Sequence, residues 1–128
     1  MPAYITIDPN DRRPVYLQIA GGIKAVIARG ELVEGMALPS VRQLAADLGV
    51  NLNTVAAAYR ELQDEALIAI KPGSGAVVSA HTTARKTEQL RGSLRTALME
   101  LVLSGVTRTQ IVRMVLAELR ALGKGVKG

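Results

Sequence analysis

The sequence predicts a mainly α-helical fold with one small β-hairpin. Two short helix patterns lie on either side of a tight turn between Leu38 and Tyr59. Further along, two short runs rich in β-branched residues flank the turn-forming residues 72–75. A helix-turn-helix that is followed at once by a hairpin is the arrangement of a winged helix-turn-helix domain. We therefore expect such a domain over residues 1–80 and a separate helical region over residues 81–128.

The first predicted helix begins at Pro14 and ends at Gly30. Proline suits the first position of a helix because its missing N–H would be unpaired there in any case. Apolar side chains then recur at helical spacing on one face, at Tyr16, Ile19, Ile23, Val26 and Ile27. The pair Gly21–Gly22 costs the helix about 1 kcal/mol per glycine relative to alanine. Either a close helix contact requires these small residues or they only weaken the helix.

The next two helices form the predicted helix-turn-helix. Ser40 is a good N-cap, and Gln43 completes the sequence pattern of a capping box. Gly49 supplies the positive φ that ends this helix, and Asn51 caps the next one, which runs to about Glu65. A helix-turn-helix needs a small residue, a turn glycine and a locking apolar residue, and these fall at Ala45, Gly49 and Val55.

Two strands and a linker follow. Residues 67–70 and 76–78 are expected to pair around Pro72–Gly75, where proline and glycine favour a turn. Residues 79–86 are polar and are typical of a linker.

Two amphipathic helices are predicted after the linker. The first ends at Gly105, and the second begins with a capping box from Thr107 to Gln110 and ends at Gly123, beyond which the tail is expected to fray. They either pack on the winged domain as a self-contained hairpin or bury their apolar faces against a second copy through a two-fold interface. We favour dimerisation, through Leu90, Leu94, Leu98, Leu101, Ile111, Val115, Leu119 and Leu122.

Charge and composition narrow the functional classes. The net charge is +5, but residues 1–80 carry seven Lys and Arg against eight Asp and Glu, whereas residues 81–128 carry nine against three. Bulk basicity therefore does not argue for nucleic-acid binding by the winged part. The chain has no Cys, no apolar run of about 18 residues and no signal-peptide pattern, so we expect a cytoplasmic protein without a membrane span.

No enzyme chemistry is visible in the sequence. There is no Ser/His/Asp set, no phosphate-binding loop and no pair of carboxylates in an apolar helical pattern. A metal site is not expected at the single His81, because neither Cys nor a second His accompanies it. We predict no catalytic residues, no metal and no cofactor.

Several motifs between residues 12 and 79 belong together. They are PVYLQI (14–19), the connector Gly30–Gly35, LPSVRQLA (38–45), VNLNTVAAAY (50–59) and the wing glycines Gly73 and Gly75. This part of the chain resembles the winged-helix domain of the GntR family of bacterial transcription regulators. With its VYLQI and NTVAAAY variants and a C-terminal part of only about fifty residues, the chain is similar to the YtrA-type branch of that family, in which the tail is a helical dimerisation unit.

The resemblance implies which residues contact DNA. Arg42 would pair with a guanine edge or the backbone, Asn53 would pair with an adenine edge, and Thr54 and Ser40 suit phosphate oxygens. Alternatives remain: Arg42 could be a solvated charge, Asn51 a cap alone, and Tyr59 a core residue. The candidate DNA-binding residues are Ser40, Arg42, Asn51, Asn53, Thr54, Tyr59, Lys71, Gly73 and Gly75.

The sequence also departs from the family pattern. Leu52 and Ala56 stand where other branches carry Arg, so fewer side chains are available for base recognition. Ala66 stands where the family usually has Gly, which implies strain if a positive φ is needed there.

The function expected from the resemblance is transcription regulation. The chain would act as a homodimeric repressor on an inverted-repeat operator in double-stranded DNA, and such regulators often govern transporter genes. Two rival functions remain: a winged helix that binds another protein, and an architectural protein that binds DNA without sequence preference. No effector ligand can be assigned from the sequence.

Overall fold

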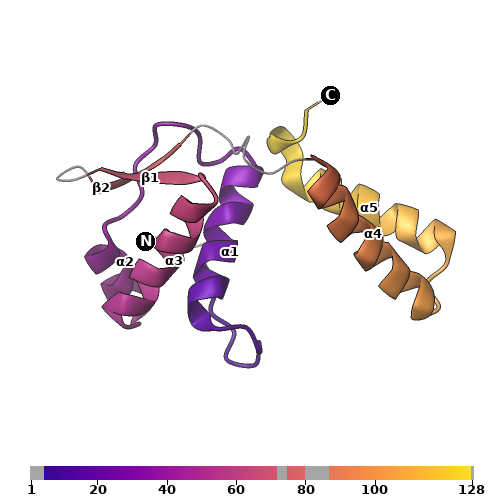
Figure 1. Cartoon of the computed structure of the whole chain (residues 1–128), viewed down its shortest axis with the longest axis horizontal. Helices are drawn as coiled ribbons and strands as arrows, with labels where there is room; N and C mark the ends of the chain where they lie inside the picture. Colours follow the sequence, from indigo (N-terminus) through magenta and orange to yellow (C-terminus); the bar gives the residue numbers. More distant parts are fainter. Residues whose placement is uncertain (1–4, 72–74, 80–86, 128) are drawn as a thin grey trace.

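The computed structural model describes residues 5–71, 75–79 and 87–127 of the chain. Three helices and a hairpin form one packed part, and two further helices form an arm beside it (Figure 1). The mainly helical architecture with a single hairpin is as predicted. In chain order the elements are α1 (Val15–Ala28), α2 (Val41–Leu48), α3 (Leu52–Asp64), β1 (Ile68–Lys71), β2 (Gly75–Val78), α4 (Thr87–Leu103), α5 (Arg108–Leu122) and the 3-10 turn η1 (Gly123–Gly125).

The hydrophobic core lies where α1, α2 and β1 pack on α3. The apolar stripe predicted for the first helix is confirmed, since Ile19, Ile23 and Val26 are buried and its other two members are half-buried. Burial of each large aliphatic side chain contributes about 1.5–3 kcal/mol. The largest fully buried side chains are Tyr59, Ile19, Ile23, Leu44, Leu62, Val26 and Val55.

The cap of α2 differs from the predicted capping box. The Ser40 hydroxyl accepts a hydrogen bond from the Gln43 backbone N–H at 3.0 Å, as expected. The Gln43 side chain, however, donates to the Asp47 carboxylate at 2.9 Å instead of returning to Ser40. Asp47 lies one turn further along the helix and offers a charged acceptor, which makes the stronger bond. The prediction of a complete box is therefore wrong, whereas the box at Thr107 and Gln110 is confirmed.

A third short segment extends the hairpin. The strands β1 and β2 are antiparallel, with Ile68 opposite Val78. Residues 35–38 then run along the free edge of β2: the Gly35 N–H donates to the Val78 carbonyl at 2.8 Å, and the Leu38 N–H donates to the Ala76 carbonyl at 2.9 Å. The sequence predicted a connector that ends at Gly35 and no strand pairing for the residues that follow it. Its backbone bonds tie the start of the helix-turn-helix to the wing.

The buried Gln18 holds the N-terminal arm against α1. Its Oε1 accepts from the Asp8 N–H at 2.8 Å, and its Nε2 donates to the carbonyls of Asp8 and Arg13 at 3.3 and 3.1 Å. These bonds satisfy the only buried polar side chain among the core residues described, and Ile5 completes that core.

The helices α4 and α5 contribute nothing to this core. Both are described along their full length, and no side chain in either is buried. None of the described helices is long and apolar enough to cross a membrane. The tail from Gly123 was expected to fray, but residues 123–125 form a 3-10 turn next to the end of α1, so that expectation is wrong for these three residues.

Candidate nucleic-acid interface

The outer face of α3 is the centre of the candidate interface. Four buried residues, from Val55 to Leu62, fix the inner face of this helix, so the opposite face is presented outward. Asn51 caps the helix by accepting the Asn53 N–H at 2.7 Å, as predicted. The Asn53 side chain lies on the outer face and is exposed, which leaves its amide free to pair with a base edge.

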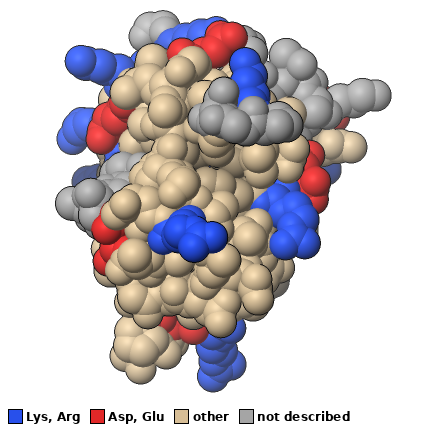
Figure 2. All heavy atoms as spheres, turned by 90° about the vertical axis from the view of Figure 1, so that its left-hand side faces the viewer, with Lys and Arg blue, Asp and Glu red and all other residues tan. Residues whose placement is uncertain are grey.

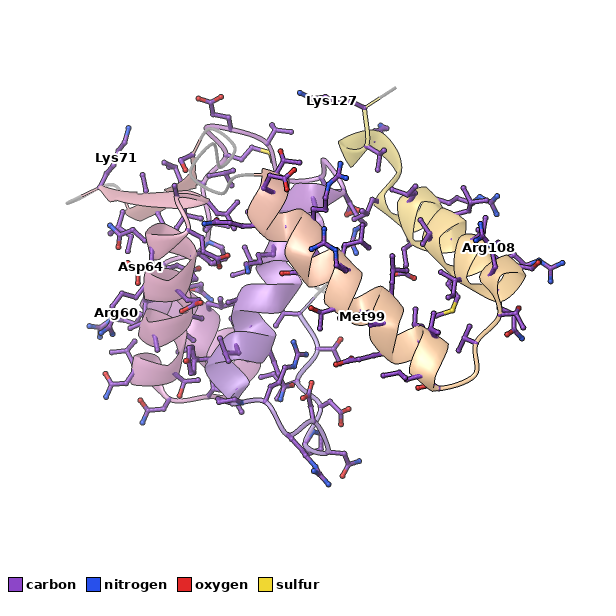
Figure 3. The ribbon with its side chains drawn as sticks, turned by 45° about the vertical axis from the view of Figure 1, so that its right-hand side comes forward. Arg60, Asp64, Lys71, Met99, Arg108 and Lys127 are labelled. Carbon is purple, nitrogen blue, oxygen red and sulfur yellow. The ribbon has the colours of Figure 1, made fainter. Side chains whose placement is uncertain are left out.

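Arg60 belongs to the same outer face and was missed by the sequence reasoning. It is exposed and lies seven residues after Asn53, which is two helical turns. Figure 3 shows Arg60 and Asp64 projecting from the outer side of α3. The spacing alone could have identified Arg60, whose charge suits a phosphate oxygen.

Arg42 lies in the first turn of α2. Its side chain is exposed and makes no hydrogen bond or ion pair with any other described residue. The guanidinium is therefore available to a ligand. Ser40, which precedes α2, is exposed as well, but its hydroxyl already accepts the Gln43 N–H. The hydroxyl proton of Ser40 remains available to a phosphate.

Tyr59 is placed in the core. Its side chain is 1% exposed, and its hydroxyl donates to the Pro39 carbonyl at 2.6 Å. This bond fixes the residue immediately before Ser40, at the start of α2. Tyr59 therefore positions the helix-turn-helix from inside and does not lie on its outer surface.

The wing is the second part of the candidate interface. Lys71 ends β1, is exposed and projects from the tip of the hairpin (Figure 3). Gly75 begins β2 with φ of +77°, a conformation that favours glycine, and a Cβ on it would have open space around it. The predicted residue Gly73 lies outside the described residues.

A groove separates the first turn of α1 from the beginning of α3. Thr54 is half-buried on its wall, and Tyr16, which the sequence placed in the core, is also only half-buried there. Just before α1, the Arg13 side chain donates hydrogen bonds to the Asp11 carboxylate, and these bonds lower the pKa of that carboxyl. The groove has a volume of about 460 Å³ and is lined by Pro14, Val15, Tyr16, Asn51, Asn53, Thr54 and Ala57.

The charge on this face is sparse. Figure 2 shows the side of the molecule that carries α2, α3 and the hairpin, on which isolated Lys and Arg side chains are separated by wide uncharged areas. This matches the count of seven basic against eight acidic residues in the first eighty. If this face binds DNA, a few placed side chains have to supply the recognition, because a weak field gives little sequence-independent attraction.

The predicted dimerisation residues lie on α4 and α5. Leu90, Leu94, Val115 and Leu119 are exposed, with Leu94 55% exposed. The other four, Leu98, Leu101, Ile111 and Leu122, are half-buried.

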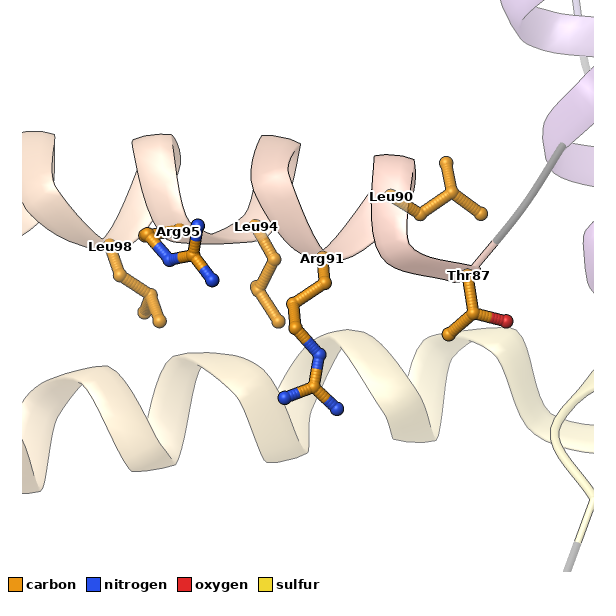
Figure 4. Close-up of a pocket in the computed structure, with 6 residues that line it drawn as sticks. All are labelled: Thr87, Leu90, Arg91, Leu94, Arg95 and Leu98. Atoms are coloured by element: carbon orange, nitrogen blue, oxygen red, sulfur yellow. The ribbon is translucent and has the colours of Figure 1, made fainter.

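An apolar groove runs along α4. Leu94, Leu98 and Arg91 extend from α4 towards α5 (Figure 4). The groove has a volume of about 620 Å³, and its other lining residues are Thr87, Leu90 and Arg95.

More apolar side chains are exposed on the two helices than the sequence reasoning named. Leu103 is 86% exposed and Val102 is 62% exposed. The remaining exposed large apolar residues of α4 and α5 are Met99, Val112, Met114 and Leu116. An apolar surface of this extent is typical of an interaction site.

Comparison with known proteins identifies relatives of the whole arrangement. The family described as "Bacterial regulatory proteins, gntR family" matches residues 15–78, from the start of α1 to the end of β2. The HTH-type transcriptional repressor YtrA of Bacillus subtilis (strain 168) is 34% identical over 99 residues, which cover 77% of this chain and 76% of the repressor.

Solved structures agree with the fold. A transcriptional antiterminator from Listeria monocytogenes EGD-e superposes with a TM-score of 0.84 at 30% identity, covering 98% of each chain. YtrA from Sulfolobus acidocaldarius, a GntR-family transcription factor, superposes with a TM-score of 0.64 at 40% identity, covering 76% of this chain and 99% of that one. The first similarity extends through α4 and α5 as well as through the winged helix.

Proposed function

Because this chain belongs to the gntR family of bacterial regulatory proteins, which bind DNA and are not enzymes, we propose that it is a homodimeric repressor that recognises an inverted-repeat operator. The observation that carries the proposal is the helix-turn-helix surface, on which the capped helix α3 presents the exposed Asn53 and the first turn of α2 presents the exposed Arg42. A regulator of bacterial promoters works in the cytoplasm.

Base recognition depends on Arg42 and Asn53. An arginine pairs with the O6 and N7 atoms of guanine through two hydrogen bonds, and an asparagine pairs with the N6 and N7 atoms of adenine in the same way. Both side chains are exposed. Leu52 is 44% exposed on the same helix, where it can contact a thymine methyl group but cannot donate a hydrogen bond.

Backbone contacts come from the surroundings of these two residues. Ser40, Thr54 and Arg60 offer hydroxyl and guanidinium groups to phosphate oxygens, and the N-terminal N–H groups of α3 add a positive dipole. At the wing, Lys71 supplies positive charge. Gly73 and Gly75 have no side chain, which allows the backbone of the wing to approach a minor groove. Tyr59 acts from the core, through its bond to Pro39.

Dimerisation is supported by the exposed apolar surface of α4 and α5. Two helices that bury no side chain are not stabilised by their own packing, so a further surface has to cover them. A second copy of the chain supplies an identical surface around a two-fold axis. The same symmetry would place two recognition helices about 34–36 Å apart, one turn of DNA, on an inverted repeat.

The simplest mechanism of repression is occlusion of a promoter by the bound dimer. The relative from Bacillus subtilis is named a repressor, which supports this direction of control. The family resemblance also supports genes of membrane transporters as targets.

An electrophoretic mobility shift assay with the DNA upstream of the chain's own gene tests the proposal. We expect a discrete shifted band that an excess of random DNA does not remove. Absence of a shift at low salt would favour the rival in which the winged helix serves protein–protein contact and the basic C-terminal half docks an acidic partner. Equal competition by random and upstream DNA would favour an architectural protein without sequence preference.

A further inference from the structure

The C-terminal turn of the chain lies against the end of the first helix. The turn η1 follows α5 directly, and Gly30 lies two residues beyond α1. A Cβ atom built on Gly30 would be 3.5 Å from the Gly125 nitrogen and 3.5 Å from the Lys124 Cβ. Two segments from distant parts of the sequence therefore meet, with η1 next to the end of α1 in Figure 1.

Gly125 is the closest point of this contact. A Cβ atom on Gly125 would overlap the carbonyl oxygen of Ala28 and would lie 2.5 Å from its carbonyl carbon and 3.2 Å from the Arg29 Cα. These neighbours are backbone atoms, which cannot move aside as a flexible side chain can. Gly125 is not among the glycines with positive φ. Space alone, and not backbone conformation, therefore requires glycine at this position.

The contact joins two parts of the molecule that are also linked covalently by the chain between Val78 and Thr87. A single covalent connection leaves the orientation of one body on another free to vary. A second point of attachment removes that freedom. The turn η1 provides such a point, because it ends α5 and packs on the helix that buries Ile19 and Ile23 in the winged-helix core.

We propose that the packing of Gly125 on the backbone of Ala28 and Arg29, which we call the seat, fixes α4, α5 and η1 on the end of α1. The seat would thereby set the distance between the two DNA-binding domains of the dimer. This inference deepens the proposed function and rests on its dimer. A fixed seat restricts the pair of recognition helices to one separation, and this selects operators by the spacing between their half-sites. Gly125 is a positioning residue in this scheme, since it lies on the C-terminal turn and not on α3 or the wing.

Distances between spin labels test the seat directly, because the chain contains no Cys and two introduced cysteines are unique. We choose the variant Gln63→Cys on α3 together with Thr109→Cys on α5, both at exposed positions. The doubly labelled chain is mixed with a large excess of unlabelled chain, so that the measured distance lies within one protomer. We expect one narrow distance in the full-length chain.

Gly125→Ala should abolish the narrow distance and leave a broad distribution, and so should a chain that ends at Leu122 and lacks the seat altogether. Gly92→Ala is the matched control: Gly92 lies in α4, a Cβ there would have nothing within 4 Å, and the narrow distance should remain. If Gly125→Ala and the shortened chain both keep the narrow distance, the seat does not exist and the inference is wrong.

A second measurement separates the seat from the dimer. The chain labelled at Gln63→Cys alone, without dilution, reports the distance between protomers. A narrow distance that broadens in Gly125→Ala supports both the dimer and its control by the seat. If no distance between protomers is measured, the dimer of the proposed function is contradicted, and so is the control of half-site spacing by Gly125. The distance measured within one protomer still decides whether Gly125 fixes the helical unit on α1.

Discussion

At the scale of single residues, Ala66 is the point of greatest backbone strain. It connects α3 to β1 with φ of 62° and is the only residue other than glycine with a positive φ among those described. Its carbonyl accepts the Ser79 hydroxyl at 2.5 Å, and its N–H donates to the Gln63 carbonyl at 2.9 Å. These bonds hold the left-handed conformation although its Cβ makes it unfavourable by about 1–2 kcal/mol.

Ala66→Gly should therefore stabilise the protein. Relief of the left-handed strain exceeds the added entropy of a glycine in the unfolded chain, so we expect the free energy of unfolding to rise by about 0.5–1 kcal/mol. Denaturant unfolding followed by circular dichroism measures the change. Ala69→Gly in β1 is the control and should lower the same free energy by about 0.5–1 kcal/mol. Equal destabilisation by both substitutions would contradict strain at Ala66.

Arg42→Ala should weaken operator binding without affecting stability. Loss of a paired guanidinium–guanine contact costs about 1–3 kcal/mol of binding free energy. Titration of operator and random DNA measures the two affinities. Arg108→Ala removes the same charge from the start of α5, far from α3 in Figure 3, and should leave the affinity for the operator nearly unchanged. An Arg42→Ala variant with undiminished operator affinity would exclude base recognition by Arg42.

Residue-scale predictions from sequence succeed where the interaction is local. The cap at Asn51 and the turn at Gly49 need only backbone geometry, and both are confirmed. The Gln43 side chain was misassigned because Asp47 competes for it, and that choice depends on rotamers. The sequence predicted strain at Ala66 only if its φ angle is positive. The sign of that angle depends on how the fold connects α3 to β1.

At the scale of elements, α4 and α5 are distinguished by their lack of burial. Among the residues that the structure describes, those of the buried core lie between Ile5 and Val78, so α4 and α5 add none to that core. Their many exposed leucine, valine and methionine side chains are held at the surface of the isolated chain. Such a surface is the strongest structural support for an interface.

Leu94→Glu should dissociate the proposed dimer and leave the fold intact. Leu94 is 55% exposed in the single chain, so the substitution creates no buried charge within it. In a dimer interface the same carboxylate would be desolvated without a partner, which is strongly unfavourable. Analytical ultracentrifugation should give a monomer for Leu94→Glu and a dimer for Gln89→Glu, an exposed polar position on α4. An unchanged dimer would place the interface elsewhere.

The elements that sequence patterns predicted are those with strong periodicity or clear caps. The helices begin and end within about three residues of their predicted bounds. Residues 35–38 were missed because their pairing with β2 is made by backbone atoms, which leave no side-chain pattern. The turn at Gly123–Gly125 was missed for a similar reason, since its contact with α1 depends on the absence of a side chain.

At the scale of the whole molecule, the excess of positive charge and the candidate DNA interface lie in different parts of the chain. The positive charge is concentrated in residues 81–128, whereas the winged part that carries the candidate interface is slightly acidic. In the proposed function, specific recognition by such a domain comes from positioned side chains and from the two-fold repetition of the proposed dimer. The seat at Gly125 would make that repetition rigid.

Selection of binding fragments from a random DNA pool, followed by sequencing, is the decisive test of a sequence-specific dimeric regulator. A homodimer with one recognition helix per subunit should enrich an inverted repeat whose half-sites have a single preferred spacing close to one helical turn. Enrichment of no motif, or of one unrepeated half-site, would contradict a sequence-specific dimeric regulator.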